Sequence, residues 1–266
     1  MTAPRIVLAS ASPRRRELLE RLGLAVEVRP AHVDETALPG EAPRAHVERL
    51  AREKAAAVAV EAADALVIAG DTVVVVDGKI VTKPGDREEA VAMLLGLQGR
   101  EHRVDTGVAV TAPGGRTAAA VVSADVRFRA FDRTMAEAYA ATGEPLDKAG
   151  AYALQGRGGM FVAAITGSPS TVVGLPIHLV PRLLARAHHD AAGPGLAEDV
   201  DLALEHPLIP VDIGREVVGM RELRPRLSKE LFALVPQDPA ELVVDFEDAF
   251  GGRRERHADE TELEVA

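Results

Sequence analysis

The 266-residue sequence contains no cysteine and no tryptophan, and aromatic residues make up only 3% of it. The absence of cysteine excludes disulfides, thiolate metal sites and cysteine nucleophiles, and it fits a cytoplasmic protein. The low aromatic content argues against the stacking platforms of proteins that bind single-stranded nucleic acid. No run of about 18 apolar residues is present, so we expect no membrane-spanning helix. The apolar stretch at residues 6–9 is too short for a signal peptide.

The net charge of −10 is unevenly distributed along the chain. Residues 1–190 contain 23 basic and 23 acidic residues, whereas residues 191–266 contain 8 basic and 18 acidic residues. A segment rich in glycine, alanine and proline at 191–195 separates the two parts. We therefore expect a globular domain at 1–190, without a net charge that would repel a polyanionic ligand. Residues 191–266 form an acidic extension, and its apolar-poor end at 251–266 is typical of disorder.

The first 190 residues mix helical and strand patterns. Apolar periodicity predicts helices at 13–22, 42–62, 87–97, 135–141 and 176–187. Strands are predicted at 5–9, 25–28, 66–71, 72–76, 79–82, 103–111, 118–128 and 160–165. Hairpin turns are predicted at Asp77-Gly78 and at residues 113–115. This order is typical of a mixed α/β or α+β sheet rather than a regular βαβ array.

Residues 8–18, LASASPRRREL, place three arginines in the first turn of a predicted helix. That end of a helix already carries partial positive charge, so the cluster is suited to an anion. Arg16 lies four residues before Glu20, and we expect these two to form a surface ion pair. Arg14 and Arg15, with the free helical N–H groups and the hydroxyl of Ser10, can bind phosphate. The alternative is a basic helix start without a ligand.

Lys54 and two carboxylates are the next candidates. Lys54 lies on the apolar stripe of the 42–62 helix, where a lysine must either reach solvent or meet an anionic partner. Asp71 follows the apolar segment 66–70, and we predict it at the end of a strand, where α/β sheets bind ligands. It is a candidate metal ligand or base there, and a capped turn is the alternative. Glu35, in the polar loop VDET, can join Asp71 and substrate oxygens around Mg²⁺.

The segment from Gln155 to Gly159, QGRGG, matches neither a Walker A loop nor a dinucleotide-binding fingerprint. Its glycines are consistent with a tight turn, while Gln155 offers a donor and an acceptor to the edge of a base. The serines lack the G-x-S-x-G elbow of α/β-hydrolases.

In their order and spacing, these motifs resemble the Maf (septum-formation) family of nucleoside triphosphate pyrophosphatases over about residues 4–188. The similarity is carried by LASASPRRREL, VDET, REKA around Lys54, GDTVVVVDGKIVTKP, DKAGAYALQGRGG and STVVGLP. The resemblance implies hydrolysis between the α- and β-phosphates, giving a nucleoside monophosphate and pyrophosphate. It also implies an elongated mixed sheet with flanking helices around a deep cleft, a divalent cation (Mg²⁺ or Mn²⁺) and a homodimer.

The resemblance assigns roles to individual positions. Asp71 corresponds to the residue that activates water, and Glu35 with Asp71 to the metal ligands. The substrate-binding positions are Ser10, Arg14, Arg15, Lys54 and Lys83. The type that acts on dTTP and UTP is matched at three positions, Arg14, Thr72 and Gln155, and its substrates can include modified pyrimidine nucleotides. The type that acts on 7-methyl-GTP tends to have Trp, Gln and Glu at these positions.

Two prolines depart from the family pattern, Pro169 and Pro181, and we expect Pro181 to kink or delay the last helix. The competing hypothesis for function is a non-catalytic regulator of cell division that binds nucleotide or nucleic acid. Few aromatics and a neutral first 190 residues disfavour a nucleic-acid partner.

Overall fold

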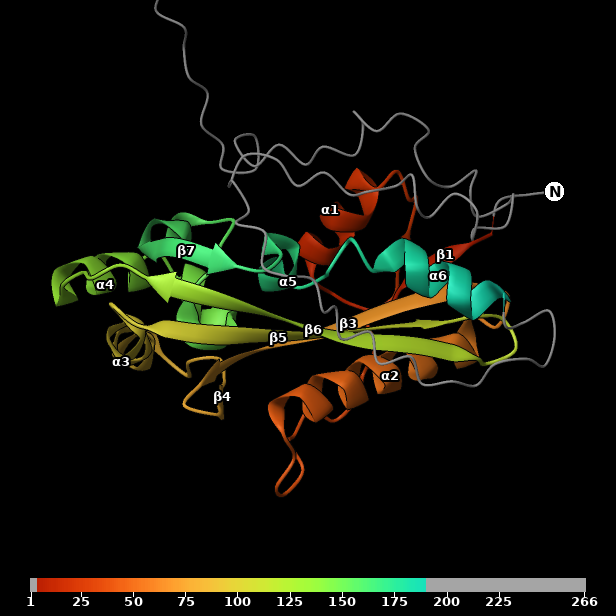
Figure 1. The fold of residues 1–266 in the computed structure, drawn as a ribbon, viewed down its shortest axis with the longest axis horizontal. Coiled ribbons are helices and arrows are strands. Elements are labelled where there is room, and N and C mark those ends of the chain that lie inside the picture. Colours follow the sequence, from red (N-terminus) through yellow and green to blue (C-terminus); the bar gives the residue numbers. More distant parts are fainter. Residues whose placement is uncertain (1–3, 190–266) are drawn as a thin grey trace, which may run out of the picture.

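The computed structural model describes residues 4–189, which form a mixed sheet covered by helices on both faces (Figure 1). The expectations for the acidic extension at 191–266 lie outside the described residues. The strands are β1 (Ile6–Leu8), β2 (Glu27–Val28), β3 (Leu66–Val76), β4 (Lys79–Val81), β5 (Glu101–Thr111), β6 (Thr117–Phe128) and β7 (Val162–Thr166). The α-helices are α1 (Pro13–Arg21), α2 (Pro43–Glu61), α3 (Arg87–Leu97), α4 (Arg133–Ala140), α5 (Pro169–Val173) and α6 (Val180–His189).

The strand order is β2-β1-β3-β5-β6-β7, and β4 pairs with β3. β1 runs parallel to both β2 and β3, and every other pair is antiparallel. The mixed sheet predicted from the sequence is therefore confirmed. Both predicted hairpins are also present, since β4 follows β3 through Asp77-Gly78 and β6 follows β5 through the turn at 113–115.

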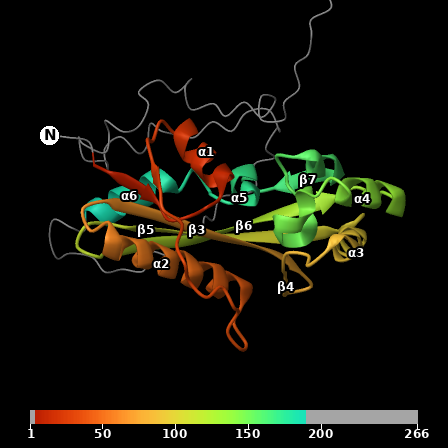
Figure 2. The ribbon, with the colours of Figure 1, turned by 180° about the vertical axis from the view of Figure 1, so that it is seen from behind.

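Helices cover the two faces of the sheet unequally. α2 lies along one face, and α1, α5 and α6 lie on the opposite face (Figures 1 and 2). Small side chains of α2, including Ala51 and Ala55, pack on Val67 and Ala69 of β3. Leucines of α1 and α6 pack on the other face, against Ile68 among others. α3 and α4 enclose a separate aromatic cluster at one end of the sheet.

Residues 66–76 form one continuous strand, so the prediction that Asp71 ends a strand is wrong. Asp71 lies in the middle of β3, because the antiparallel ladder with β5 runs without a break from Val67 to Val75. On its other side, β3 pairs with β1 only as far as Ile68 and with β4 only from Val74. Asp71 and Thr72 therefore lie in a gap between two neighbouring strands, which opens the sheet at this point.

The prolines explain two further differences from the sequence prediction. α6 begins at Val180 rather than near residue 176, because Pro181 is tolerated only in the first turn of a helix. Pro169 occupies the first position of the short helix α5, where its missing N–H costs nothing. Ser12 is the N-cap residue of α1, and its side chain makes no capping hydrogen bond.

Short 3₁₀ turns occupy much of the segment between α4 and β7, namely η1 (Glu144–Asp147), η2 (Ala149–Ala151) and η3 (Arg157–Phe161). Such turns are too short to leave a periodic apolar pattern, and the sequence did not predict them. Within residues 4–189, no helix is long and apolar enough to cross a bilayer.

Candidate active site

A cavity of about 500 Å³ opens where β3 lacks a neighbouring strand. All nine side chains selected from the sequence line it, although they come from segments as far apart as α1 and the loop before η3. They are Ser10, Arg14, Arg15, Glu35, Lys54, Asp71, Thr72, Lys83 and Gln155. The fold therefore brings together residues that the sequence separates by up to 145 positions.

Lys54 and two carboxylates form the acidic side of the cavity. Lys54 Nζ donates to Asp71 Oδ1 at 2.7 Å and lies 2.6 Å from Glu35 Oε1. Lys54 is 6% exposed and Asp71 is 7% exposed, so neither charge could stay there without the other. The structure thus selects the anionic partner over solvent for Lys54.

The environment of Glu35 is more open, since 56% of its side chain is exposed. Its partial burial opposes ionisation, but the hydrogen bond and charge of Lys54 outweigh this, so the pKa of Glu35 lies below its ordinary value. Glu35 is therefore a carboxylate at neutral pH, available at the mouth of the cavity.

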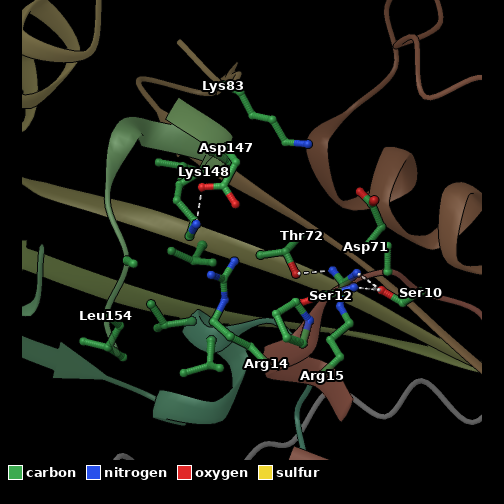
Figure 3. Close-up of a pocket in the computed structure, with 18 of the residues that line it drawn as sticks. Ser10, Ser12, Arg14, Arg15, Asp71, Thr72, Lys83, Asp147, Lys148 and Leu154 are labelled. Atoms are coloured by element: carbon green, nitrogen blue, oxygen red, sulfur yellow. Dashed lines mark hydrogen bonds and ion pairs between the residues drawn. The ribbon is translucent and has the colours of Figure 1, made fainter. Parts of the chain in front are cut away.

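Arg15 is held by three acceptors from separate segments. Its Nε donates to the carbonyl of Gly174 at 2.8 Å. Its Nη1 donates to Ser10 Oγ at 3.0 Å and its Nη2 to Thr72 Oγ1 at 3.2 Å (Figure 3). Burial lowers the pKa of Arg15, and the charge of Asp71 acts in the opposite sense. Arginine is not deprotonated in proteins, so the guanidinium remains charged at neutral pH. These bonds use three of its five N–H groups, which leaves two for a ligand.

The remaining arginines of the cluster behave as the helical geometry predicts. Arg14 lines the cavity, whereas Arg16 pairs with Glu20 at 2.7 Å on the exposed face of α1. Burial of Asp147 opposes its ionisation, but the hydrogen bond and charge of Lys148, with a smaller contribution from Arg14, lower its pKa below the ordinary value.

Lys148 and its ion-pair partner Asp147 also line the cavity, and sequence analysis did not select them. Figure 3 places this pair between Lys83 and Arg14. The only signal available was their position inside the DKAGAY segment, because a loop lysine next to an aspartate is otherwise unremarkable. With Lys148, the lining carries five basic side chains against three acidic ones.

Gln155 lines the cavity with an unused acceptor, because its Oε1 is buried and lacks a hydrogen-bond partner. Glu144 holds the adjoining glycine-rich loop by accepting from the backbone N–H groups of Arg157 and Gly158, each at 3.2 Å. Tyr139 donates to Glu144 at 2.8 Å and accepts from the N–H of Ala153. No sequence pattern indicated this anchor.

Tyr152 lines the same cavity and hydrogen-bonds Nε2 of the buried His102 at 2.8 Å. Both rings pack edge-on against Phe128. Burial lowers the pKa of His102 to about 4 and raises that of Tyr152. Both side chains are therefore neutral at pH 7, and this wall of the cavity carries no charge.

The donor set fits a hard divalent cation bound together with a substrate. In residues 4–189, no cluster of three or more His, Asp or Glu side chains is arranged to hold a metal ion alone. However, Glu35 and Asp71 both contact Lys54 Nζ, so their oxygens lie close together. Mg²⁺ is commonly bound by one or two carboxylates, several waters and substrate phosphates. The two carboxylates are suited to that mode of binding.

Comparisons with known proteins identify the family of this chain. The family model for Maf-like protein matches residues 5–187. A dTTP/UTP pyrophosphatase of Anaeromyxobacter sp. (strain Fw109-5) is 55% identical over 189 residues, which is 70% of this chain and 90% of the relative. One from Vibrio cholerae is 48% identical over 185 residues, which is 69% of this chain and 98% of the relative.

A solved structure, the Ham1 protein of Staphylococcus aureus, aligns with a TM-score of 0.34 and 19% identity. It covers 47% of this chain and 71% of that protein, a similarity too low to inform fold or function. The family match and the two pyrophosphatases are decisive, since they span nearly all of the described residues. The chain belongs to the Maf-like protein family.

Proposed function

We propose that residues 1–190 form a nucleoside triphosphate pyrophosphatase that hydrolyses dTTP and UTP, and modified pyrimidine nucleotides of the same kind, to the monophosphate and pyrophosphate. The observation that carries this proposal is the convergence of Lys54, Asp71, Glu35 and Arg15 on one cavity. A lysine held between two carboxylates, facing an anchored arginine, can bind a triphosphate and activate water. The names of the two pyrophosphatase relatives support the substrate class.

In this proposal Asp71 orients a water molecule and accepts its proton as the water oxygen bonds to the α-phosphorus. The bond from that phosphorus to the bridging oxygen breaks, and pyrophosphate leaves with the bonding electrons. Lys54 holds Asp71 Oδ1 at 2.7 Å, which fixes the orientation of the carboxylate. The cleaved bond leaves charge on pyrophosphate, and Arg14, Arg15 and Lys83 stabilise that charge. Ser10 keeps Arg15 in place and supplies a hydroxyl to the phosphates. Glu35 and Asp71 would hold Mg²⁺ or Mn²⁺, which neutralises phosphate charge when bound.

Selectivity for thymine and uracil would depend on Gln155, with Arg14 and Thr72. The buried Oε1 of Gln155 needs a donor, and the N3–H of uracil or thymine provides one. Cytosine has an acceptor at N3, which would leave two acceptors facing each other. We therefore expect UTP to be preferred over CTP.

The first test is pyrophosphate release from a panel of nucleotides, with and without Mg²⁺, by the wild type and by Asp71→Asn. We expect release from dTTP and UTP in the presence of metal. Removing a positioned general base typically costs about 10²- to 10⁴-fold, so Asp71→Asn should lose turnover by that factor. Circular dichroism controls for the fold. If Asp71→Asn hydrolyses at the wild-type rate, Asp71 is not the base. Salt-dependent DNA binding without pyrophosphate release would instead support the non-catalytic regulator.

The second test addresses the base. Gln155→Glu replaces the amide by a group that repels an acceptor-rich base edge. We expect the UTP-to-CTP ratio of kcat/KM to change while inhibition by free pyrophosphate stays within about twofold of the wild type. Equal turnover of all nucleotides by the unmutated protein would contradict the assignment.

We also propose a homodimer in the cytoplasm. Light scattering coupled to size-exclusion chromatography would measure the mass directly. A monomer at micromolar concentration would contradict the dimer.

A further inference from the structure

Thr106 is completely buried in β5, directly opposite Thr72 of β3. It does not line the cavity. Its hydroxyl donates to the carbonyl of Thr171 at 2.8 Å, and it lies 3.0 Å from Thr72 Oγ1. Neither the sequence motifs nor the proposed chemistry assigns a role to this side chain.

The direction of each hydrogen bond follows from counting protons. A carbonyl cannot donate, so the single proton of Thr106 goes to the carbonyl of Thr171. Thr106 can then only accept from Thr72, which means that Thr72 donates its own proton to Thr106. Thr72 in turn accepts from Arg15 Nη2. The result is one directed relay from Arg15 through Thr72 and Thr106 to a backbone carbonyl.

The relay ends on the same turn of the chain that binds Arg15 directly. Thr171 belongs to α5, and Gly174 follows the end of that helix and accepts from Arg15 Nε at 2.8 Å. The Thr171 carbonyl also accepts from the N–H of Gly174 at 3.1 Å, so the Thr106 hydroxyl uses its second lone pair. Arg15 is thus fixed twice against α5, once directly and once through two threonines.

We propose that Thr106 is a positioning residue that fixes Arg15 through Thr72. In this proposal Thr72 affects nucleotide choice by holding Arg15, and not by donating a hydrogen bond to the base, because its only proton is already used. The proposal rests on the proposed function in one respect, namely that Arg15 binds the phosphate chain.

The test compares Thr106→Val, which keeps the shape and removes the hydroxyl, with Thr106→Ser, which keeps the hydroxyl. Affinity for a non-hydrolysable α,β-imido analogue of dUTP is measured by calorimetry on the full chain, and KM and kcat are measured with dTTP. Losing one neutral hydrogen bond in the relay should weaken binding roughly three- to tenfold. We expect KM to rise more than kcat falls, and Thr106→Ser to stay within about twofold of the wild type.

Thr111→Val is the matched control. Thr111 is also buried in β5, and its hydroxyl also bonds a threonine of a neighbouring strand, in this case Thr117 of β6, at 2.8 Å. Thr111→Val removes a comparable hydrogen bond away from the cavity, so this variant should lower stability without weakening nucleotide binding. Equal weakening by Thr111→Val and Thr106→Val would overturn the proposal, since both would then act through the fold.

A double-mutant cycle separates a relay from two independent contacts. If Thr106 acts through Thr72, Thr72→Val should weaken binding similarly, and adding Thr106→Val should cost little more. Additive losses would overturn the proposal. An unchanged affinity in Thr72→Val would also overturn it, and that variant can be measured even if Thr106→Val fails to fold.

A wild type that binds the analogue but releases no pyrophosphate from dTTP would refute the proposed function and leave the relay intact. A wild type that does not bind the analogue would overturn both.

Discussion

At Gly107 of β5, helix α2 lies close against the sheet. Gly107 is the cross-strand partner of Asp71. A Cβ atom added to Gly107 would lie 2.3 Å from the carbonyl oxygen of Val47 and 2.6 Å from its carbonyl carbon. Both are backbone atoms of α2, so no side-chain rotation can relieve the contact. We therefore expect Gly107→Ala to displace the helix.

The size of this effect can be estimated from the contact. Real Cβ atoms essentially never approach another heavy atom within 3.0 Å, so the 2.3 Å contact requires a shift of at least 0.7 Å. Overpacking of this kind costs about 1–3 kcal/mol or more in free energy of unfolding. For a domain of this size, 3 kcal/mol corresponds to a fall in Tm of roughly 6–12 °C. Because α2 carries Lys54 two turns after Val47, the shift should also lengthen the 2.7 Å contact with Asp71.

The assay is thermal unfolding followed by calorimetry, with kcat for dTTP measured well below Tm. Gly96→Ala is the control, because Gly96 lies inside α3 and nothing is within 4 Å of its added Cβ. Alanine is the better helix former by about 0.5–1 kcal/mol, so Gly96→Ala should raise Tm. A loss of about 1 kcal/mol, the smallest expected, would lower Tm by roughly 2 °C. A Gly107→Ala variant that melts within about 2 °C of the wild type would therefore refute the reasoning. A large loss of Tm with unchanged kcat would show that Lys54 does not depend on this contact.

Two further outcomes can be measured. His102 is neutral in the folded protein because burial lowers its pKa to about 4. Between pH 6.5 and 4 the unfolded state therefore binds more protons, and the contribution of His102 to stability falls by about 3 kcal/mol as the pH falls. His102→Phe should reduce the pH dependence of the denaturation midpoint across that window and leave the part due to His178, whose pKa burial also lowers to about 4. A curve parallel to the wild type would contradict the assignment. Glu144→Ala removes the acceptor that holds the loop after Gln155, so the UTP-to-CTP ratio of kcat/KM should fall towards one, while the exposed variant Glu137→Ala should not change it. An unchanged ratio in Glu144→Ala would mean that the loop holds its shape by itself.

The elements with a strong local signal were predictable from the sequence. α2 and α3 follow their apolar periodicity, and the two hairpins follow from Asp77-Gly78 and the glycines at 114 and 115. The prediction was wrong for Asp71, because a glycine and an aspartate in succession are typical of a strand end. Here the ladder with β5 continues through them, and only the pairing partners reveal this.

The candidate site was predictable in part, and for unequal reasons. Lys54 could be selected physically, because a charge on an apolar stripe needs an explanation, but the sequence could not say which anion it meets. Lys83 and Thr72 were selected only through the family resemblance. Thr106, Glu144 and Lys148 were missed, because an ordinary threonine, glutamate or lysine shows its role only through contacts with residues distant in the chain.

The two halves of the site depend on adjacent residues of one strand. Successive side chains of a strand point to opposite faces, so Asp71 reaches Lys54 of α2 while Thr72 reaches Arg15 on the side of α1 and α5. β5 supports each half with a matching residue, since Gly107 opposite Asp71 admits α2 and Thr106 opposite Thr72 fixes Arg15. A slip of one residue between β3 and β5 would place Thr106 or Val108 opposite Asp71, so a branched side chain would meet the backbone of α2 in either direction. The register of this strand pair, more than any single side chain, therefore sets the geometry of the cavity.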